Sequence, residues 1–229
     1  MDKALAIIPA RGGSKRIPRK NIKDFLGKPI IAYAIETALT CGLFSDVMVS
    51  TDDHEIAEIA KNHGASVPFL RSENNANDFA STVDVIKEVE KEYDARFSTV
   101  FDRICCIYPT APLIKAEHLL AGMSLMRESD FDSVFPVVPF SYPIWRGLKV
   151  INGKVQMVWP ENQNVRSQDL KPVYHDAGQW YWYNPSKITD SLFTTNTASI
   201  ILSEEEVQDI DTPSDWLMAE MKYKLLYEK

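Results

Sequence analysis

The chain has 229 residues, of which 45% are hydrophobic and 25% charged, so wholesale disorder is excluded and the length fits one α/β domain. No apolar run approaches the roughly 20 residues that span a membrane, and the run at 4–8 stops at Pro9, too early for the apolar region of a signal peptide. Three cysteines, two of them adjacent, cannot build a disulfide framework, so the sequence indicates a reduced, cytoplasmic protein.

The net charge of −7 is unevenly spread along the chain. Seven basic residues and one acidic residue lie between Arg11 and Lys28, whereas the rest of the chain carries 18 basic and 31 acidic residues. Nonspecific nucleic-acid binding normally needs a broad basic surface, so the overall charge argues against a nucleic-acid partner. A small positive region on an acidic protein favours a compact polyanion instead. The alternative is an ordinary solvated surface, but glycines and prolines interrupt these charges.

Strand-like and helix-like segments alternate through the first 138 residues. Apolar runs predict strands at 4–8, 46–50, 103–108 and 133–138. Helical spacing and capping residues predict helices at 29–40, from Thr51 or Asp52 to about His63, from a capping box at Ser81 and Asp84 to about Tyr93, and at 115–129. Such alternation is typical of a three-layer α/β/α domain with a mostly parallel sheet.

The character of the sequence changes from Pro139 onward. Asn152-Gly153, between extended segments at 148–151 and 154–159, is the strongest short signal for a β-hairpin. Residues 200–202 predict a last core strand, and Thr212 followed by Pro213 and Asp215 predicts the start of a final helix. We therefore expect a single domain over 1–229 with a hairpin-bearing excursion at about 139–178.

A basic, glycine-containing loop at 9–21 directly follows the first strand. In open α/β sheets this position is the usual site for phosphate. Gly12 and Gly13 permit close approach of the backbone, Ser14 adds a hydroxyl donor, and the arginines and lysines supply counter-charges for phosphate oxygens. The loop matches neither the Walker pattern nor the dinucleotide-binding G-x-G-x-x-G pattern.

Residues 8–22 resemble the N-terminal signature of the CMP-sugar synthetases, the acylneuraminate cytidylyltransferases. Further stretches match that family in chain order at 50–53, 71–82, 166–170 and 209–213. The related 3-deoxy-manno-octulosonate enzymes carry a different loop, without the Gly-Gly-Ser-Lys run found here. The resemblance implies a Rossmann-like nucleotidyltransferase fold. It also implies transfer of CMP from CTP to a nine-carbon 2-keto sugar acid, with release of pyrophosphate.

The resemblance also implies roles for individual residues. The triphosphate would be held by Arg11, Gly12, Gly13, Ser14, Lys15 and Lys20. The rest of the nucleotide would contact Asn21, Arg71, Ala80 and Thr82, although Arg71 has an equal alternative as a surface loop residue. Because the transition state spreads charge over phosphoryl oxygens, fixed charges do most of the catalysis. The catalytic set would be Arg11, Lys15, Lys20 and Asp211.

Two carboxylates near the C-terminus suit a magnesium site. Asp209 and Asp211 are two residues apart and so lie on the same side of an extended segment. Carboxylate oxygens with open positions beside them suit Mg²⁺. Carboxylate pairs also occur by chance, but the family resemblance implies Mg²⁺ as the cofactor. Cys41, Cys105 and Cys106 lack zinc spacing and are interpreted as small buried residues.

The sequence departs from the sialic acid pattern at two places where the family binds its sugar. Tyr108 stands where a glutamine is typical, and residues 175–179 replace a Pro-Asn-Gly-Ala run. Both variants resemble the pseudaminic acid branch, whose substrate is a 5,7-diacetamido, 9-deoxy sugar acid. A wall drawn from Tyr108, Trp180 and Tyr181 would suit such a sugar, unless the 180–183 aromatics only pack a strand on both faces. The sugar-binding residues implied are Tyr108, Arg166, Gln168, His175 and Gln179, with Arg166 pairing with the sugar carboxylate.

The leading hypothesis is therefore synthesis of CMP-pseudaminic acid for bacterial surface or flagellar glycosylation. One alternative is the same reaction on N-acetylneuraminic or legionaminic acid. Another is a catalytically silent nucleotide-binding protein, but the intact pair of Asp209 and Asp211 argues against it. The partners expected are CTP, a nonulosonic acid and a second copy of the chain, without nucleic acid or membrane. The resemblance suggests that the segment at about 139–178 reaches across to a second subunit, and its hairpin, with Trp145 and Trp159, supplies apolar area that a monomer would leave in water.

Overall fold

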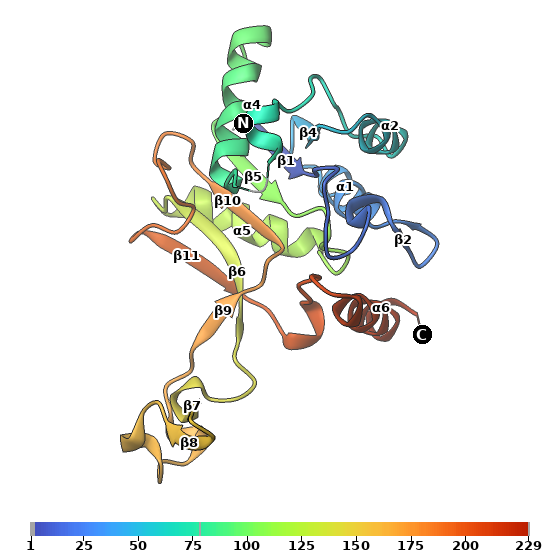
Figure 1. Cartoon of the computed structure of the whole chain (residues 1–229). Helices are drawn as coiled ribbons and strands as arrows, with labels where there is room; N and C mark the ends of the chain where they lie inside the picture. The colour runs from blue at the N-terminus through green and yellow to red at the C-terminus, as the bar shows by residue number, and fades with distance from the viewer. Residues whose placement is uncertain (1–2, 78, 229) are drawn as a thin grey trace.

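The computed structural model describes residues 3–77 and 79–228. Its centre is a seven-stranded sheet in the order β11-β6-β10-β5-β1-β4, with β9 pairing to β6 off this path (Figure 1). The strands are β1 (Ala4–Pro9), β4 (Asp46–Ser50), β5 (Arg103–Ile107), β6 (Ser133–Pro139), β9 (Tyr174–Asp176), β10 (Trp180–Tyr183) and β11 (Thr197–Ile201). Only β9 and β10 run against the others in this sheet, so the expected mostly parallel arrangement is confirmed.

Helices cover both faces of this sheet. The α-helices of the described residues are α1 (Ile30–Thr40), α2 (His54–Asn62), α3 (Glu73–Ala76), α4 (Thr82–Phe97), α5 (Ala116–Glu128) and α6 (Pro213–Tyr227), of which α1, α2, α4 and α5 pack on the sheet. Ala4, Ala6 and Ile8 of β1 pack in a core with α1, α2 and α5. Leu5 and Ile7 pack in a second core with α4. All five side chains are fully buried, which explains why this strand is apolar at successive positions and confirms the three-layer fold.

Helix capping follows the sequence closely, with one correction. Ser81 with Asp84 forms the predicted capping box of α4, and Thr212 with Asp215 forms that of α6. The cap of α2 is neither Thr51 nor Asp52 but Asp53, whose side chain accepts a hydrogen bond from the Ile56 backbone N–H at 3.0 Å. Helix α4 also continues to Phe97, past the predicted end at Tyr93.

The last predicted strand forms, but its position in the chain and in the sheet differs from the prediction. Strand β11 begins at Thr197, ends at Ile201, and lies at the edge of the sheet rather than in its core. Ile201 is accordingly 61% exposed. The sequence at 200–202 carries only the apolar half of this strand. The polar Thr197 and Ser199 gave no strand signal, because an edge strand buries one face at most.

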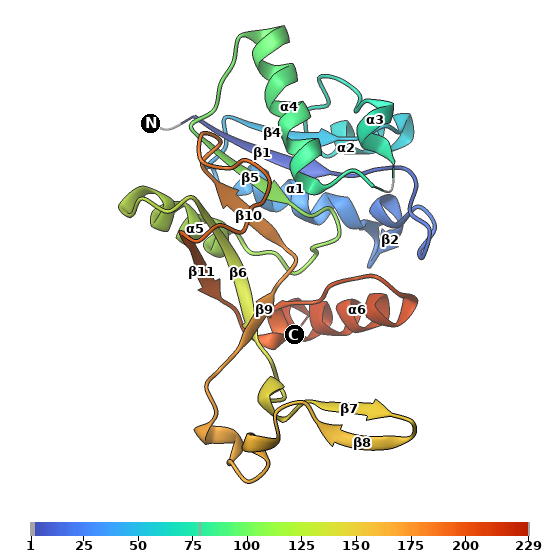
Figure 2. The same cartoon turned by 60° about the vertical axis from the view of Figure 1, so that its left-hand side comes forward.

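The segment at 140–173, between β6 and β9, leaves the sheet as an arm (Figure 2), whereas the end of the predicted 139–178 excursion returns to the sheet through β9. Its hairpin consists of β7 (Leu148–Ile151) and β8 (Lys154–Met157), joined by Asn152 and Gly153 with φ of 52° and 73°. Positive φ at both central residues is what a tight two-residue hairpin turn needs, and it explains the Asn-Gly signal. Most of the hairpin side chains are exposed, including Val150 at 69%.

A small third core lies under the basic loop. It joins Ile17 of that loop to Phe25, Ile30 and Tyr33 and, from the C-terminal segment, to Ile210, Trp216 and Ala219. The short strands β2 (Asp24–Phe25) and β3 (Lys28–Pro29) form a hairpin beside it. The basic loop is thus anchored to residues almost two hundred positions later. In the part of the chain that the structure describes, no helix is long and apolar enough to cross a membrane.

Candidate active site

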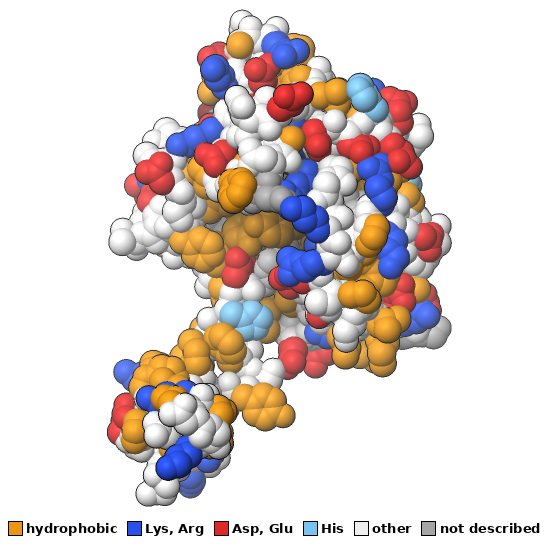
Figure 3. Space-filling view, in the orientation of Figure 1, with side chains coloured by type: hydrophobic (Ala, Val, Ile, Leu, Met, Phe, Trp, Pro, Cys, Tyr) orange, Lys and Arg blue, Asp and Glu red, His pale blue; other side chains and the backbone are white. Residues whose placement is uncertain are grey.

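A cavity of about 690 Å³ opens at the ends of β1 and β5, where the strand order departs from the chain order. Ligands in open α/β sheets bind at such a point. Lys and Arg side chains gather around a hollow in this region of the molecule (Figure 3). The predicted residues that line the cavity are Arg11, Ser14, Lys15, Lys20, Asn21, Arg71, Ala80, Thr82 and Tyr108. Arg16, Ser81 and Thr110 also line it, although sequence analysis assigned none of them to a binding site. We call it the phosphate cavity.

Gly12 has a packing role that the sequence did not suggest. Its N–H donates to Asp52 Oδ1 at 2.9 Å, and a Cβ at this position would lie 2.7 Å from Asp53 Oδ2. The glycine therefore lets the loop rest on the two aspartates that follow β4. A Cβ added at Gly13 would meet open space, and neither glycine is among the residues that line the phosphate cavity.

Arg19 anchors the loop instead of facing the cavity. Its backbone is left-handed, with φ of 54°, and its guanidinium bonds Asp53 at 2.5 and 3.1 Å and Glu55 at 2.5 Å. The hydrogen bond from Arg19 lowers the pKa of Asp53 to about 2. One of the seven cations in this segment is thus committed to holding the loop against α2.

Lys20 and Arg16 connect the loop to the predicted metal ligands. Lys20 Nζ donates to the Ile210 carbonyl at 2.6 Å and lies 3.6 Å from Asp211 Oδ1, while Arg16 lies 2.8 Å from the same oxygen. Partial burial, followed by the charge of Asp211, raises the pKa of Asp209. Carboxylate oxygens are the ligands that Mg²⁺ prefers, so Asp209 and Asp211 have the chemistry of a site for this ion. Neither aspartate is among the residues that line the phosphate cavity, but Asp211 contacts Lys20 and Arg16 of its wall.

Arg71 and Asn21 are fixed from behind. Arg71 is buried and donates through Nε to Ser50 Oγ at 3.0 Å, so it is not an ordinary surface loop residue. Burial lowers the pKa of its guanidinium from the usual value, although the group stays charged at neutral pH. Asn21 is also buried and donates to the Arg11 carbonyl at 2.9 Å. Both side chains are held in fixed positions at the cavity wall.

A second cavity of about 200 Å³ shares Ser81, Thr82 and Tyr108 with the first. We call it the tyrosine cavity, because the rings of Tyr108 and Tyr181 lie against each other with centroids 5.3 Å apart. Its remaining lining residues are Val83, Asp176, Asp190, Ser191, Leu192 and Phe193. A third cavity of about 320 Å³ contains His175, Asp176 and Asp209. Asp176 thus lies between the tyrosine cavity and the segment of the carboxylate pair.

Not every residue predicted to bind the sugar faces these cavities. Trp180 is fully buried, and Gln179 is 2% exposed with its Nε2 donating to the Glu206 carbonyl at 2.6 Å. Alternation explains the difference, because Trp180 and Trp182 face the α5 side of β10 while Tyr181 and Tyr183 face the α4 side. Trp180 and Tyr181 cannot share a wall, so that expectation was wrong.

The other predicted sugar-binding residues lie on or near the arm. Arg166 side-chain atoms are 72% exposed and bond Asp169 at 2.8 Å, and Gln168 lines a separate cavity on the arm. His175 is exposed and packs its ring against Phe140. The structure does not bring Arg166 and Gln168 to the phosphate cavity of their own chain.

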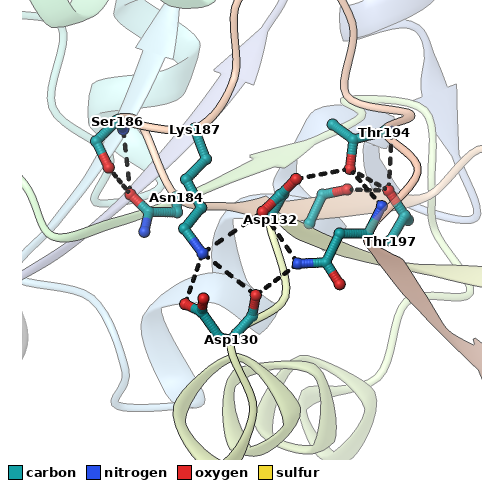
Figure 4. A network of polar contacts seen from close by, with 9 residues as sticks. Asp130, Asp132, Asn184, Ser186, Lys187, Thr194 and Thr197 are labelled. Atoms are coloured by element: carbon teal, nitrogen blue, oxygen red, sulfur yellow. Dashed lines mark hydrogen bonds and ion pairs between the residues drawn. The ribbon is translucent and has the colours of Figure 1, made fainter.

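The loop at 184–196 brings Leu192 and Phe193 to the tyrosine cavity, and a polar network holds it there (Figure 4). The network is centred on Asp132, which accepts from Thr194 Oγ1 at 3.0 Å and from Asn196 Nδ2 at 3.2 Å. Lys187 joins it by bonding Asp130 Oδ1 at 2.5 Å. Sequence analysis missed this loop, and apart from the lone apolar pair it contains no signal that would have found it.

One further cluster has the composition of a metal site. Glu117, His118 and Glu206 offer ligand atoms within 4.8 Å of one another. Lys115 Nζ lies 2.5 Å from Glu206 Oε1, however, and already supplies the positive charge. The cluster is better explained as an ion pair that attaches the start of α5 to the segment before Asp209.

The comparisons with known proteins agree with this geometry. A cytidylyltransferase family model matches residues 5–208. The chain is 41% identical to the pseudaminic acid cytidylyltransferase of Campylobacter jejuni, over 99% of this chain and 98% of the relative. It is 34% identical to the CMP-N,N'-diacetyllegionaminic acid synthase of Legionella pneumophila, over 98% and 97% of the two chains.

A solved structure of CMP:2-keto-3-deoxy-manno-octonic acid synthetase complexed with CTP has the same fold. The TM-score is 0.70 at 19% identity, over 99% of this chain and 100% of that one. At this identity the likeness concerns the fold alone. The family match over most of the sequence and the full-length relatives establish that the chain belongs to the cytidylyltransferase family and is a nucleotidyltransferase.

Proposed function

We propose that this enzyme transfers CMP from CTP to pseudaminic acid and releases pyrophosphate, as part of bacterial surface or flagellar glycosylation. The observation that carries the proposal is the pair of adjoining cavities, one lined by five basic residues and the other by two tyrosines. The full-length similarity to a pseudaminic acid cytidylyltransferase supports the choice of sugar.

The chain's own residues account for the chemistry of phosphoryl transfer. Arg11, Lys15 and Lys20 line the phosphate cavity, where they bind the triphosphate and stabilise the charge that develops on its oxygens. Asp209 and Asp211 would hold Mg²⁺, which would supply positive charge to the phosphate oxygens and favour deprotonation of the attacking hydroxyl. Tyr108 and Thr82 belong to both cavities and place the sugar beside the nucleotide.

The working form is proposed to be a homodimer joined through the arm. Val150, Val155 and Leu148 are each more than 60% exposed on the hairpin, more apolar surface than so short a segment usually leaves in water. Because Arg166 lies on this arm, it would pair with the sugar carboxylate in the partner's cleft. Sedimentation of a monomer at micromolar concentration would contradict the dimer.

The enzyme is placed in the cytoplasm, with no nucleic-acid partner. Cys41, Cys105 and Cys106 are free, which fits a reducing compartment. The acidic surface outside the phosphate cavity is unsuited to a nucleic acid.

The test is release of pyrophosphate from CTP and Mg²⁺ with each of three sugar acids in turn, pseudaminic, N,N'-diacetyllegionaminic and N-acetylneuraminic acid. We expect pseudaminic acid to give the highest kcat/KM. A higher kcat/KM for either of the other two acids would change the proposed sugar but leave the proposed reaction standing. Absence of pyrophosphate release with all three would overturn the proposed function.

A further inference from the structure

Asp176 is an exposed carboxylate at the wall of the tyrosine cavity, and the phosphoryl-transfer chemistry gives it no role. Its Oδ1 accepts the Gly178 N–H at 2.9 Å, and its Oδ2 accepts the Tyr181 hydroxyl at 2.6 Å. Burial raises the pKa of Tyr181 far above its usual value, so this hydroxyl stays protonated and donates. A carboxylate offers about four lone-pair positions, so Asp176 keeps capacity to accept from a ligand.

The two adjoining cavities differ sharply in charge. The described residues that line the phosphate cavity include five basic side chains and no acidic one: Arg11, Lys15, Arg16, Lys20 and Arg71. Those that line the tyrosine cavity include no basic side chain and two acidic ones, Asp176 and Asp190. An anionic ligand that spans both cavities therefore has a preferred direction.

The two ends of a diacetamido 2-keto sugar acid also differ in charge. Its carboxylate is attached to the anomeric carbon, which carries the hydroxyl that attacks phosphorus, and its acetamido groups lie further along the chain. The charge contrast directs the carboxylate toward the cations and the acetamido groups toward Asp176. This direction also brings the attacking hydroxyl to the phosphate, as the reaction requires.

An acetamido group consists of an N–H donor and a methyl group. The tyrosine cavity offers a counterpart to each, since Asp176 accepts hydrogen bonds and Phe193 presents a ring that is 55% exposed. Phe193 is supported from behind by Phe135, with ring centroids 4.5 Å apart. A hydroxyl in place of the acetamido group would leave the aromatic surface uncovered, so nothing would hold it in place against Asp176.

We propose that Asp176 is a specificity-determining residue, which accepts a hydrogen bond from an acetamido N–H of the substrate and keeps the substrate carboxylate out of the tyrosine cavity. Tyr181 is its positioning residue, because the hydroxyl of Tyr181 fixes the carboxylate. The inference rests on the proposed function and deepens it at the sugar side of the same site.

The test compares wild type with Asp176→Asn for kcat/KM on pseudaminic acid and on N-acetylneuraminic acid, which carries a hydroxyl where the former has its second acetamido group. Hydrogen bonds to a charged acceptor are roughly twice as strong as neutral ones, so we expect about a tenfold loss on pseudaminic acid. The loss should appear in the KM of the sugar acid, with the KM of CTP unchanged. The ratio of kcat/KM on pseudaminic acid to kcat/KM on N-acetylneuraminic acid should be smaller in Asp176→Asn than in wild type.

Asp94→Asn is the matched control. Asp94 is exposed on α4 and lines neither the phosphate cavity nor the tyrosine cavity, so we expect a change of less than about twofold. Tyr181→Phe removes the positioning bond while leaving the carboxylate, and should cost about threefold in the same KM. This variant also tests the inference if Asp176→Asn fails to fold, which thermal unfolding would show.

The sign of the effect decides the direction of the substrate. If Asp176→Asn lowers the KM of the sugar acid, the carboxylate faces Asp176 and the inference is overturned. Unchanged selectivity in both Asp176→Asn and Tyr181→Phe also overturns it, while the proposed function stands. If wild type turns over no sugar acid at all, the proposed function fails and the inference fails with it.

Discussion

The phosphate side and the sugar side of the cleft are built in opposite ways. The phosphate side comes mainly from one continuous loop at 11–21, held against α2 by Arg19 and Asp53. The sugar side is assembled from four separate segments, at 81–83, 108, 176–181 and 190–193. The function of a loop whose binding residues are consecutive can be predicted from that stretch of sequence. The residues of the sugar side come together only when the sheet has formed.

The two sides also differ in what holds them in place. The loop at 11–21 is fixed by charge, through pairs such as Arg19 with Asp53. The sugar side is fixed by ring packing, such as Tyr108 against Tyr181, and the ion pair of Lys187 that supports its loop lies outside the cavity lining. We therefore expect changes on the phosphate side to act through charge and to be large. Changes on the sugar side should act through KM and be smaller.

The largest effect should come from Asp211→Asn, on the phosphate side. Interactions of a metal with phosphoryl oxygens contribute several kcal/mol, so we expect a loss of about 100-fold or more in kcat. Calorimetric titration with Mg²⁺ should show weakened metal binding in the same variant. Its counterpart is His175→Asn, which should mainly raise the KM of the sugar acid and leave turnover at saturation. If His175→Asn abolishes turnover while CTP and Mg²⁺ still bind, His175 acts as a general base. The expectation that changes on the sugar side act only through KM would then be wrong.

Much of the fold could be predicted from the sequence because its signals, like those of the loop at 11–21, lie in consecutive residues. Runs such as 4–8 are apolar at every position because both faces of the sheet are covered, and the caps at Ser81 and Thr212 are local hydrogen bonds. Strand β9 has three exposed residues, so it has no apolar pattern to detect. The strand at 197–201 lies at an edge and was recognised only in part.

The sugar side was harder to predict, because its members depend on which face of a strand they occupy. Gln179 and Asp176 belong to the same short stretch, yet Gln179 turns inward to the Glu206 carbonyl while Asp176 faces the cleft. Nothing in the sequence of 175–179 distinguishes them. Phe193 depends further on the network around Asp132, which joins residues more than sixty positions apart.

An intermediate effect should come from Asp53→Asn, measured as the free energy of unfolding against pH. Asparagine caps a helix about as well as aspartate, so the change isolates the charge paired with Arg19. Since the folded pKa of Asp53 is about 2, below the unfolded value of about 3.9, the stabilisation is full above the unfolded pKa and is lost as the pH falls through the folded pKa.

We expect wild type to exceed Asp53→Asn by about 1–2 kcal/mol at pH 7, with the difference closing near pH 2. Glu58→Gln on the same helix is the control, because its pair with Lys61 is exposed and should be worth less than about 0.5 kcal/mol. Asp53→Asn should also bind CTP more weakly, because the loop at 11–21 loses the bond that holds it against α2. A difference that persists unchanged at pH 2 would mean that the charge of Asp53 does not hold the loop.

The smallest effect should come from Thr194→Val, which sharpens the comparison from the sugar side. The substitution keeps the shape of the side chain and removes the hydroxyl that donates to Asp132 Oδ2 at 3.0 Å, so the loop carrying Phe193 loses one of its attachments. A hydrogen bond to a charged acceptor contributes about 1.5–3 kcal/mol, but Asn196 and Lys187 still hold Asp132 in the variant. We therefore expect the KM of the sugar acid to rise by about two- to tenfold, with the KM of CTP unchanged. Thr40→Val is the matched control, because the hydroxyl of Thr40 makes a similar bond to the Glu36 carbonyl at the exposed end of α1. It should leave both KM values unchanged. If Thr194→Val raises the two KM values equally, the 184–196 loop supports the whole cleft, and the division into two independently held sides is wrong.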